Sequence, residues 1–342
     1  MKRVLIGMSG GVDSTYAALC LREQGYDVFG AVLRMHAATE IAEAEESAAA
    51  LGIPLAVLDC TERFSGCVIS DFMREYREGR TPNPCIVCNE KVKFRALYEE
   101  ARRQGIPYIA TGHYANVVCE NGRYAIACAS DSKKDQSYML YRLPQDILSS
   151  LLLPLGDTQK SDIVEEAKRL RLHAADREES QEICFVKDES YAEYIERMCG
   201  KAKEGDFVDE HGRVLGRHKG IVHYTVGQRK GLGVSSTGRL FVKEIDVESN
   251  RIVLSDTRVL TREFSLSSCV FSGYGEEALG KGTDELFVKL RYTVPPVSAR
   301  VLNEGGGVFR VLLQEEAPFV TPGQSAVFYK GNKVVFGGIV RK

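Results

Sequence analysis

The sequence has no tryptophan and almost no net charge. Its 342 residues carry 45 Lys and Arg against 47 Asp and Glu, which gives a formal net charge of −2. This balance excludes a polybasic protein whose affinity for nucleic acid comes from bulk charge, but it allows a local basic patch. Without tryptophan, any stacking on a nucleic-acid base must use Tyr, Phe, His or Arg. The apolar fraction of 44% and the charged fraction of 27% indicate a folded globular chain rather than a disordered one.

Long apolar runs are absent as well. A membrane helix needs about 18 apolar residues, and the longest candidate, residues 148–155, is short and interrupted by Pro154. The apolar stretch after Met1 ends too early, at Gly10 and Gly11, to be an export signal. We therefore expect a cytoplasmic protein that does not contact membranes. In that compartment the ten cysteines should be reduced thiols rather than a disulfide framework.

Two periodicities alternate over the first 110 residues. Short apolar runs that predict buried strands are separated by longer stretches with the spacing of amphipathic helices. Such alternation is typical of a doubly wound parallel sheet in the α/β class. We expect strands at 4–8, 28–33, 55–58 and 108–110, and helices at 13–24, 40–51, 68–77 and 89–104.

The pattern changes after residue 113. Asn121-Gly122 predicts the turn of a β-hairpin across 117–127, and residues 137–200 have mainly helical spacing. From about residue 205 the chain is rich in short strands and turns, and its last part suits a small β-barrel. This length fits about two to three domains. We expect an α/β catalytic domain with a helical extension, a small β-rich central domain and a C-terminal β-barrel, at 1–200, 201–262 and 263–342.

A glycine-rich turn, G-M-S-G-G-V-D-S at residues 7–14, follows the first predicted strand and opens a helix. Its glycines let the backbone approach an anion closely, and the helix start supplies free N–H groups. The turn lacks the lysine of a Walker loop, so it suits pyrophosphate as a leaving group better than a γ-phosphate. Asp13 is suited to orienting the loop or binding Mg²⁺. The motif resembles the PP-loop of ATP pyrophosphatases, which adenylate a substrate oxygen; the plain alternative is a capped strand-to-helix turn.

A pair of cysteines follows two prolines in T-P-N-P-C-I-V-C-N at residues 81–89. A helix that begins near Asn89 would put Cys88 at its N-terminus, where the pKa of a thiol is expected to be lowered. On spacing alone, Cys85 and Cys88 could be a redox pair, half of a metal site or two unrelated thiols. The chain has no second C-x-x-C, which disfavours a four-cysteine zinc site. Cys184 on its own would be a buried structural cysteine.

Six motifs then occur in order between residues 7 and 233: G-M-S-G-G-V-D-S, T-P-N-P-x-x-x-C-N-x-x-x-K-F, T-G-H-Y, K-D-Q-S-Y, I-C-F and G-Q-R-K-G-L-G. With them the chain resembles the tRNA-specific 2-thiouridylase family, which thiolates the wobble uridine of certain tRNAs, over nearly its whole length. The resemblance implies a PP-loop domain of the adenine nucleotide alpha hydrolase-like type. It also implies ATP and Mg²⁺, tRNAs that accept glutamate, glutamine or lysine, and a cysteine desulfurase or sulfur-relay protein as partner. Family members are commonly monomers, so a monomer is expected.

The resemblance also assigns residues by motif. It puts the nucleophile at Cys88 and the persulfide carrier at Cys184, which would join in a disulfide as sulfur is released. The ATP site falls on Gly7, Met8, Ser9, Gly10, Gly11, Val12, Asp13, Ser14, Leu33 and Gly112. Contacts to the target base fall on Asn83, Pro84 and Cys85, and other tRNA contacts fall on His113, Lys134, Asp135, Gln136, Arg291, Tyr292 and Gln324.

Cys85 stands where many family members have an aspartate with an acid/base role. A cysteine could perform that role only as a thiolate. Cys85, Cys88 and Cys184 could together ligate a [4Fe–4S] cluster with one open iron, which would carry the sulfur instead of a persulfide. Two further alternatives are a different adenylating PP-loop ligase and a non-catalytic protein that binds RNA or a cluster.

A basic stretch at residues 213–243 contains seven Lys and Arg and no acidic residue. Such a run is most often a solvated face. Here Gln228-Arg229-Lys230 lies between glycines, in a loop suited to phosphate contacts. With the family resemblance, we predict that Arg229 binds tRNA phosphate.

Overall fold

The N-terminal part of the chain forms a five-stranded sheet in the order β3-β2-β1-β4-β7, with every neighbouring pair parallel. The computed structural model describes residues 2–37, 39–169, 183–235, 238–273, 275, 286–318 and 320–341. The strands are β1 (Lys2–Gly7), β2 (Tyr26–Arg34), β3 (Leu55–Asp59), β4 (Tyr108–Ala110) and β7 (Leu151–Leu152). Four of them were predicted. β7 was not, because two residues inside an apolar, helix-like stretch give no periodicity.

Helices cover both faces of this sheet, which confirms the doubly wound α/β prediction. Alternate residues of β1 point to opposite sides: Val4 and Ile6 join one apolar core and Leu5 joins the other. The first core also contains α1 (Val12–Glu23), α2 (Ala42–Leu51) and α9 (Lys160–Arg169), and the second contains α6 (Phe94–Arg103). Within the described ranges, none of the helices combines the length and apolar character that a membrane crossing requires.

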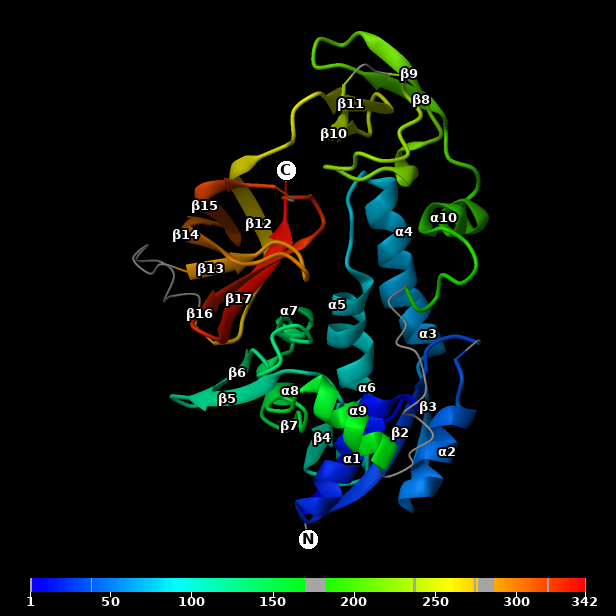
Figure 1. The fold of residues 1–342 in the computed structure, drawn as a ribbon, viewed down its shortest axis with the longest axis vertical. Helices are drawn as coiled ribbons and strands as arrows, with labels where there is room; N and C mark the ends of the chain where they lie inside the picture. The colour runs from blue at the N-terminus through cyan, green and yellow to red at the C-terminus, as the bar shows by residue number, and fades with distance from the viewer. Residues whose placement is uncertain are drawn as a thin grey trace.

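Two long helical rods extend from the sheet towards the middle of the molecule (Figure 1). The first comprises α3 (Thr61–Phe64), a π-helical turn η1 (Ser65–Ile69) and α4 (Ser70–Arg77); the second comprises α5 (Pro84–Cys88), a π-helical turn η2 (Asn89–Lys93) and α6. The second rod was expected to begin near Asn89, and this was wrong. It begins at Pro84, with Asn83 as an extended N-cap residue (φ −115°, ψ 95°), because proline is favourable in the first helical turn.

The predicted hairpin is present as β5 (Asn116–Glu120) and β6 (Arg123–Ala127). Asn121 and Gly122 both have positive φ, at 50° and 77°, as a two-residue hairpin turn requires. In the described part of the expected helical region, α9 is joined by α7 (Ser137–Leu140), α8 (Gln145–Leu148) and α10 (Tyr191–Cys199); residues 170–182 of that region lie outside the described residues. Ser190 caps α10 in a reciprocal capping box with Glu193.

The rest of the chain is β-rich, as predicted. A central four-stranded sheet has the order β10-β11-β8-β9, with β8 (Gly205–Val208), β9 (Val214–His218), β10 (Phe241–Asp246) and β11 (Arg251–Ser255). It is followed by β12 (Thr261–Phe271), β13 (Leu286–Lys289), β14 (Val297–Gly305), β15 (Val308–Ala317), β16 (Ser325–Lys330) and β17 (Lys333–Val340). These six strands close into a barrel through the β12–β17 pairing, and the hairpin adds to it through β17 and β6.

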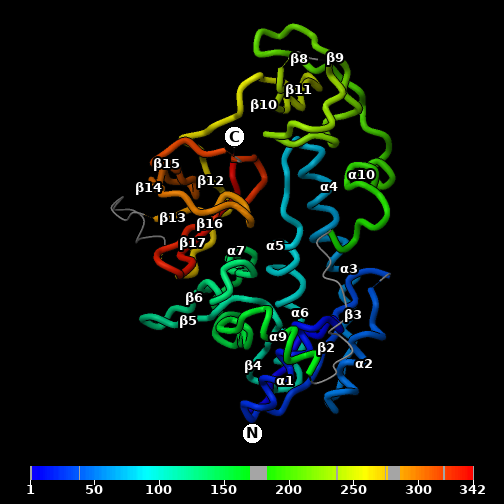
Figure 2. Tube along the Cα trace, viewed as in Figure 1, coloured from blue at the N-terminus to red at the C-terminus, as the bar shows by residue number. Residues whose placement is uncertain are grey.

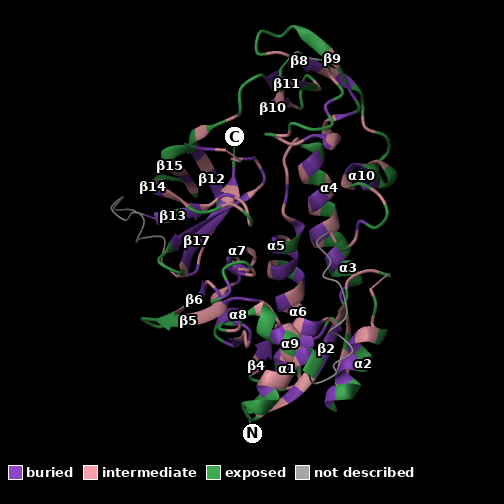
Figure 3. Cartoon of the chain, in the orientation of Figure 1, coloured by how far each residue is buried: buried purple, intermediate pink, exposed green. Residues whose placement is uncertain are grey.

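The barrel lies to the side of the two helical rods, and the central sheet lies beyond the far end of α4 (Figure 2). Three parts of the chain therefore meet at the connection between α4 and α5, where Thr81 contacts both the barrel and the central domain. Buried residues run through the barrel strands and along α4 as well as through the parallel sheet (Figure 3). Inside the barrel, Phe328 and Phe336 stack with ring centroids 4.2 Å apart. The contact region around Thr81 leads directly into α5, which carries two of the candidate thiols, Cys85 and Cys88.

Candidate active site

Hydrogen bonds from its own hydroxyl groups fix the conformation of the glycine-rich loop between β1 and α1. The Ser9 N–H donates to Ser14 Oγ (3.2 Å), and Ser14 Oγ donates to the Gly11 carbonyl (3.0 Å). Gly10 has φ +81°, which favours glycine. A Cβ on Gly112 would lie 2.8 Å from backbone atoms of Asp13 and Ser14, so only glycine lets this strand end approach the loop. This close approach sets Gly112 beside the N-terminus of α1, the kind of helix end at which anionic groups bind.

Asp13 is fixed by two residues that sequence reasoning missed. Its Oδ1 accepts a bond from the Tyr114 hydroxyl (2.6 Å) and forms an ion pair with Lys160 Nζ (2.7 Å). Tyr114 is clamped in turn by Gln136, whose backbone N–H donates to the Tyr114 carbonyl and whose Oε1 accepts from the Tyr114 N–H. Tyr114 belongs to the quoted T-G-H-Y motif, but no local pattern marks Lys160, which α9 brings to the loop. Lys160 thus brings an ammonium group beside the glycine-rich loop from a distant helix.

One cavity of about 670 Å³ brings together many of the predicted residues. It is lined by part of the glycine-rich loop, by the end of β2, by the start of α5 and by the segment around Cys184. The predicted residues on its wall are Gly7, Met8, Ser9, Asp13, Ser14, Leu33, Pro84, Cys85, Cys88, Gly112, His113, Gln136 and Cys184. Lys93, His36 and Phe185 also line it and were not predicted. The nucleotide loop and all three candidate thiols therefore share one enclosure.

Cys88 is a buried thiol, 9% exposed, in the fifth position of α5. Burial raises its pKa to about 11; nearby Cys85 and Cys184 push it the same way, and the Lys93 ammonium opposes them. The predicted lowering of this pKa was wrong, because the helix begins five residues earlier than expected and the thiol is desolvated. It is Cys85, exposed, that stands in the first turn. At neutral pH, Cys88 is therefore held as the thiol.

Cys184 faces the same cavity from the segment before α10. Desolvation raises the pKa of its thiol, and Cys85 adds to the effect. The neighbouring Phe185 anchors the segment, since its ring makes edge contacts with Phe64, Phe72 and Tyr194 at centroid distances of 5.6, 5.2 and 5.4 Å. Cys88 and Cys184 are both free thiols in this structure.

The cavity wall carries two kinds of side chain that could bind a metal: carboxylates, which Mg²⁺ prefers, and thiols, which an iron–sulfur cluster requires. Asp13 and Glu40 place carboxylates on the cavity wall, and Mg²⁺ commonly needs one or two carboxylates together with substrate phosphates. For a cluster, three thiols are present in the cavity. Across the described residues, however, no three His, Cys, Asp or Glu side chains gather closely enough to hold a metal ion. The cavity wall nevertheless carries donor groups of both kinds, carboxylates and thiols.

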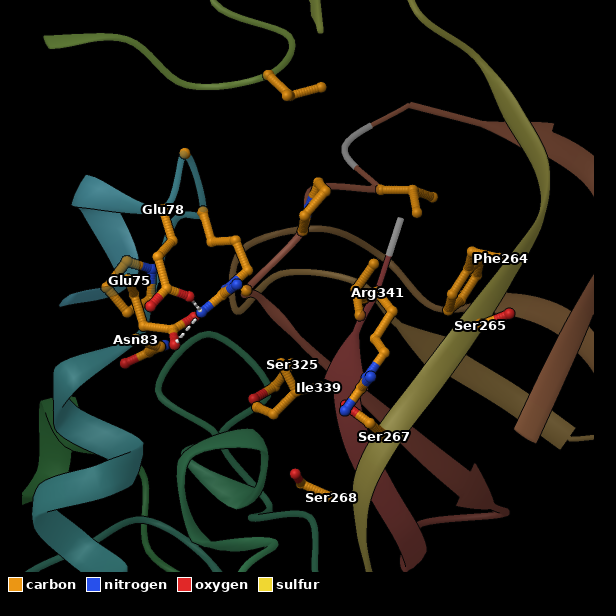
Figure 4. Close-up of a pocket in the computed structure, with 18 of the residues that line it drawn as sticks. Glu75, Glu78, Asn83, Phe264, Ser265, Ser267, Ser268, Ser325, Ile339 and Arg341 are labelled. Carbon is orange, nitrogen blue, oxygen red and sulfur yellow. Dashed lines mark hydrogen bonds and ion pairs between the residues drawn. The ribbon is translucent and has the colours of Figure 1, made fainter. Parts of the chain in front are cut away.

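The predicted tRNA contacts are spread over several places. His113 lies on the cavity wall, and desolvation lowers its pKa well below the usual value, so the ring is neutral at pH 7. Asn83 instead lines a second cavity of about 960 Å³ on the other side of α5 (Figure 4). Arg229 is exposed on the central domain, and Lys134 is half-buried.

Asp135 points away from the thiol cavity and into the junction with the barrel. It is 5% exposed, and its carboxylate accepts bonds from Ala129 N, Ser137 N and Ser137 Oγ. Lys289 of the barrel lies 3.4 Å from its Oδ2. The structure therefore places this residue in an interdomain contact.

The last three predicted tRNA contacts lie on the barrel side of that junction. Arg291 donates a hydrogen bond to Thr321 Oγ1 (2.9 Å). The ring of Tyr292 packs against the ring of Tyr138, with the ring centroids 6.4 Å apart. Gln324 binds backbone carbonyls in the loop before α5.

Comparisons with known proteins agree with this architecture. Residues 2–188 match the family model described as a tRNA methyl transferase HUP domain, 192–256 a tRNA methyl transferase PRC-barrel domain and 261–340 an aminomethyltransferase beta-barrel domain. The tRNA-specific 2-thiouridylase MnmA of Clostridium acetobutylicum is 40% identical over 359 residues, covering 99% of each chain. MnmA 1 of Clostridium botulinum strain Loch Maree is 42% identical over 356 residues, covering 100% of this chain and 99% of the relative. The chain belongs to the tRNA-specific 2-thiouridylase family.

Proposed function

We propose that this chain converts the wobble uridine of tRNA into 2-thiouridine, using ATP to activate the C2 oxygen and two cysteines to deliver sulfur. The observation that carries the proposal is the shared cavity, in which the glycine-rich loop, Cys88 and Cys184 face one another. An adenylating ligase without sulfur chemistry would leave both thiols without a role. Family membership supports the use of ATP and tRNA. We also propose that the domain limits are near residues 200 and 262.

The first step activates the base. The uridine leaves its stack to enter the cavity, as bases do in other base-modifying enzymes. Its C2 oxygen attacks the α-phosphorus of ATP, and pyrophosphate leaves. The α1 N-terminus and the loop hydroxyls would hold the phosphates of ATP. Lys160 would neutralise part of the negative charge at this site, and Asp13 together with the phosphates would hold Mg²⁺. Leu33 and Gly112 would border the adenine.

The second step transfers sulfur. The terminal sulfur of a persulfide on Cys184 attacks C2, and the C2–O bond breaks to release AMP with the uridine oxygen. The Cys88 thiolate then attacks the Cys184 sulfur, which forms a Cys88–Cys184 disulfide and expels 2-thiouridine. Cys88 loses its proton to water in this step. An external thiol reductant restores both cysteines, and a cysteine desulfurase or relay protein reloads Cys184.

The remaining assignments follow from position. Asn83, Pro84 and Cys85 start α5 and would contact the target base, while His113, Lys134 and Gln136 would contact adjoining nucleotides. The predicted Asp135, Arg291, Tyr292 and Gln324 lie at the barrel junction. We propose tRNAs that accept glutamate, glutamine or lysine as substrates, and a monomer as the active form.

Reconstitution tests the proposal. The protein is incubated with ATP, Mg²⁺, a cysteine desulfurase with cysteine, and unmodified tRNA, and the nucleosides are analysed by mass spectrometry. We expect 2-thiouridine with the wild type and none with Cys88→Ser or Cys184→Ser. Cys119→Ser and Cys199→Ser, at exposed positions, should keep full activity. Absence of product with the wild type under both aerobic and anaerobic conditions would contradict the proposal.

A cluster-dependent route predicts different results, and the presence of Cys85 beside the other two thiols makes it worth testing. The protein is purified anaerobically, and its visible absorbance and iron content are measured before the assay. A colourless, iron-free and fully active protein supports the persulfide route. Stoichiometric iron, together with loss of activity on chelation and in Cys85→Ser, would contradict the persulfide route and support the cluster-dependent one.

A further inference from the structure

The loop that leads into α5 is held by the barrel. The Thr81 N–H donates to the Pro322 carbonyl (2.8 Å), and Gln324 Nε2 donates to the carbonyls of Thr81 (2.8 Å) and Pro82 (3.3 Å). Thr81 Oγ1 also donates to Thr225 Oγ1 of the central domain (3.2 Å). The backbone groups of this loop therefore find their partners in other parts of the chain rather than within the loop itself.

Gly323 brings the two segments into direct backbone contact. A Cβ on Gly323 would lie 2.8 Å from Thr81 N and 2.9 Å from Arg80 Cβ, and the residue has φ +89°. Both the space and the backbone conformation thus require glycine. The Pro322–Gln324 turn fits against residues 80–82 with no room for one added methyl group.

This contact lies immediately before the thiol-bearing helix. Asn83, the N-cap of α5, follows Pro82 directly, and Cys85 is the second residue of the helix. Two faces of α5 line different cavities: Pro84, Cys85 and Cys88 face the thiol cavity, whereas Asn83 and Val87 face the larger one. Figure 4 shows Asn83 across that larger cavity from Ser325, which directly follows Gln324 in the chain. A shift of Thr81 would therefore move the start of α5 relative to both cavities.

We infer that Gln324 and Gly323 are positioning residues, through which the barrel sets the helix that presents Cys85 and Cys88 to the nucleotide loop. The inference deepens the proposed function and rests on it for the roles of the thiols. It also gives Gln324 a task separate from the tRNA contact that the family resemblance implies. The barrel then contributes to catalysis as well as to RNA binding.

Two variants test this with one matched control each. Gln324→Glu keeps the shape but replaces the NH₂ donor with a carboxylate, and Gln314→Glu makes the same change at an exposed barrel position. Gly323→Ala adds a methyl group that would clash with Thr81 and Arg80. Gly331→Ala, also at positive φ (+60°) but with open space around it, separates backbone strain from the clash.

The first readout needs neither tRNA nor a sulfur donor. The rates at which Cys85 and Cys88 react with iodoacetamide are measured by peptide mass spectrometry, and tRNA affinity is measured separately by filter binding. We expect both variants to change the alkylation rates and to lower kcat about tenfold, with tRNA affinity nearly unchanged. Both controls should behave as the wild type.

The inference is overturned if Gln324→Glu weakens tRNA binding while the alkylation rates stay at the wild-type values, since Gln324 would then be an RNA contact only. Thermal unfolding monitors integrity; if Gly323→Ala does not fold, Gln324→Glu alone decides. If the wild type makes no 2-thiouridine, the proposed function fails, but the alkylation comparison still tests the positioning.

Discussion

The ammonium of Lys160 lies 2.7 Å from Oδ1 of Asp13, although the two residues are 147 positions apart in the chain. Lys160 is in the first turn of α9, and Asp13 is in the first turn of α1 beside the glycine-rich loop. Their side chains are 14% and 29% exposed, so water screens the pair only partly. The pair connects the phosphate loop to the helix that precedes the Cys184 segment.

Replacing this lysine should weaken nucleotide binding. Lys160→Met removes the cation and leaves Asp13 with the Tyr114 hydroxyl as its remaining partner among the contacts described above. We expect the KM for ATP to rise about tenfold or more, because a charge-assisted bond contributes about 1.5–3 kcal/mol. Lys168→Met, at an exposed position on the same helix, is the control. An unchanged KM for ATP would remove Lys160 from the nucleotide site.

The reactivity of Cys88 should rise steeply with pH. With a pKa of about 11, only about one thiol in ten thousand is ionised at pH 7. Alkylation of Cys88 should therefore accelerate about tenfold per pH unit between pH 7 and 9. Because the folded pKa lies above the ordinary value, the free energy of unfolding should also fall as the pH rises above about 8.5. A rate already at its plateau at pH 7 would show that the thiolate is stabilised in the folded protein.

The exposed loop of the central domain should bind RNA through phosphates. Arg229→Ala should weaken tRNA binding and reduce the slope of log K against log salt by about 1. Arg217→Ala is a suited comparison, because Arg217 already pairs with Asp206 (2.8 Å) and should change the slope less. If the salt dependence of tRNA binding has the same slope in the wild type and in Arg229→Ala, Arg229 does not contact phosphate and this basic stretch is only a solvated surface.

Asp135 should matter for stability more than for RNA affinity. Asp135→Ala leaves Lys289 facing a junction without its carboxylate, which should lower the free energy of unfolding by about 3 kcal/mol. Lys289→Met in the same chain should recover part of this loss, and Asp256→Asn at an exposed position should have no effect. Denaturant unfolding measures all of these. A wild-type stability combined with weaker tRNA binding would instead make Asp135 a direct RNA contact.

Strands and turns could be predicted from the sequence where a single local pattern, such as an apolar run or an Asn-Gly pair, was present. Apolar runs located four of the five parallel strands, and Asn121-Gly122 located the hairpin turn. The start of the thiol helix was misplaced because both Asn83 and Asn89 are good N-cap residues, and proline at position 84 favours the earlier one. The error reversed the expected pKa shift of Cys88, because that shift depends on burial as well as on position in the helix.

The long-range parts of the site carried no local signal. Lys160 reaches Asp13 only because α9 packs on the same face of the sheet as α1. The contacts of Gln324 with Thr81 join residues 243 positions apart. The family resemblance pointed to Gln324 and to Cys88 separately, but periodicity and spacing do not show that the segment around Gln324 contacts the loop before the helix of Cys88.

The most direct test of the proposed sulfur transfer from Cys184 is a single-turnover experiment on the persulfide-loaded protein. Cys184 is loaded by a cysteine desulfurase, excess donor is removed, and ATP, Mg²⁺ and unmodified tRNA are added. Peptide and nucleoside mass spectrometry then measure the Cys88–Cys184 disulfide and the 2-thiouridine formed. We expect one disulfide for each 2-thiouridine, with loss of the extra sulfur atom from Cys184. Formation of 2-thiouridine while both cysteines remain free thiols, or in Cys184→Ser, would contradict it.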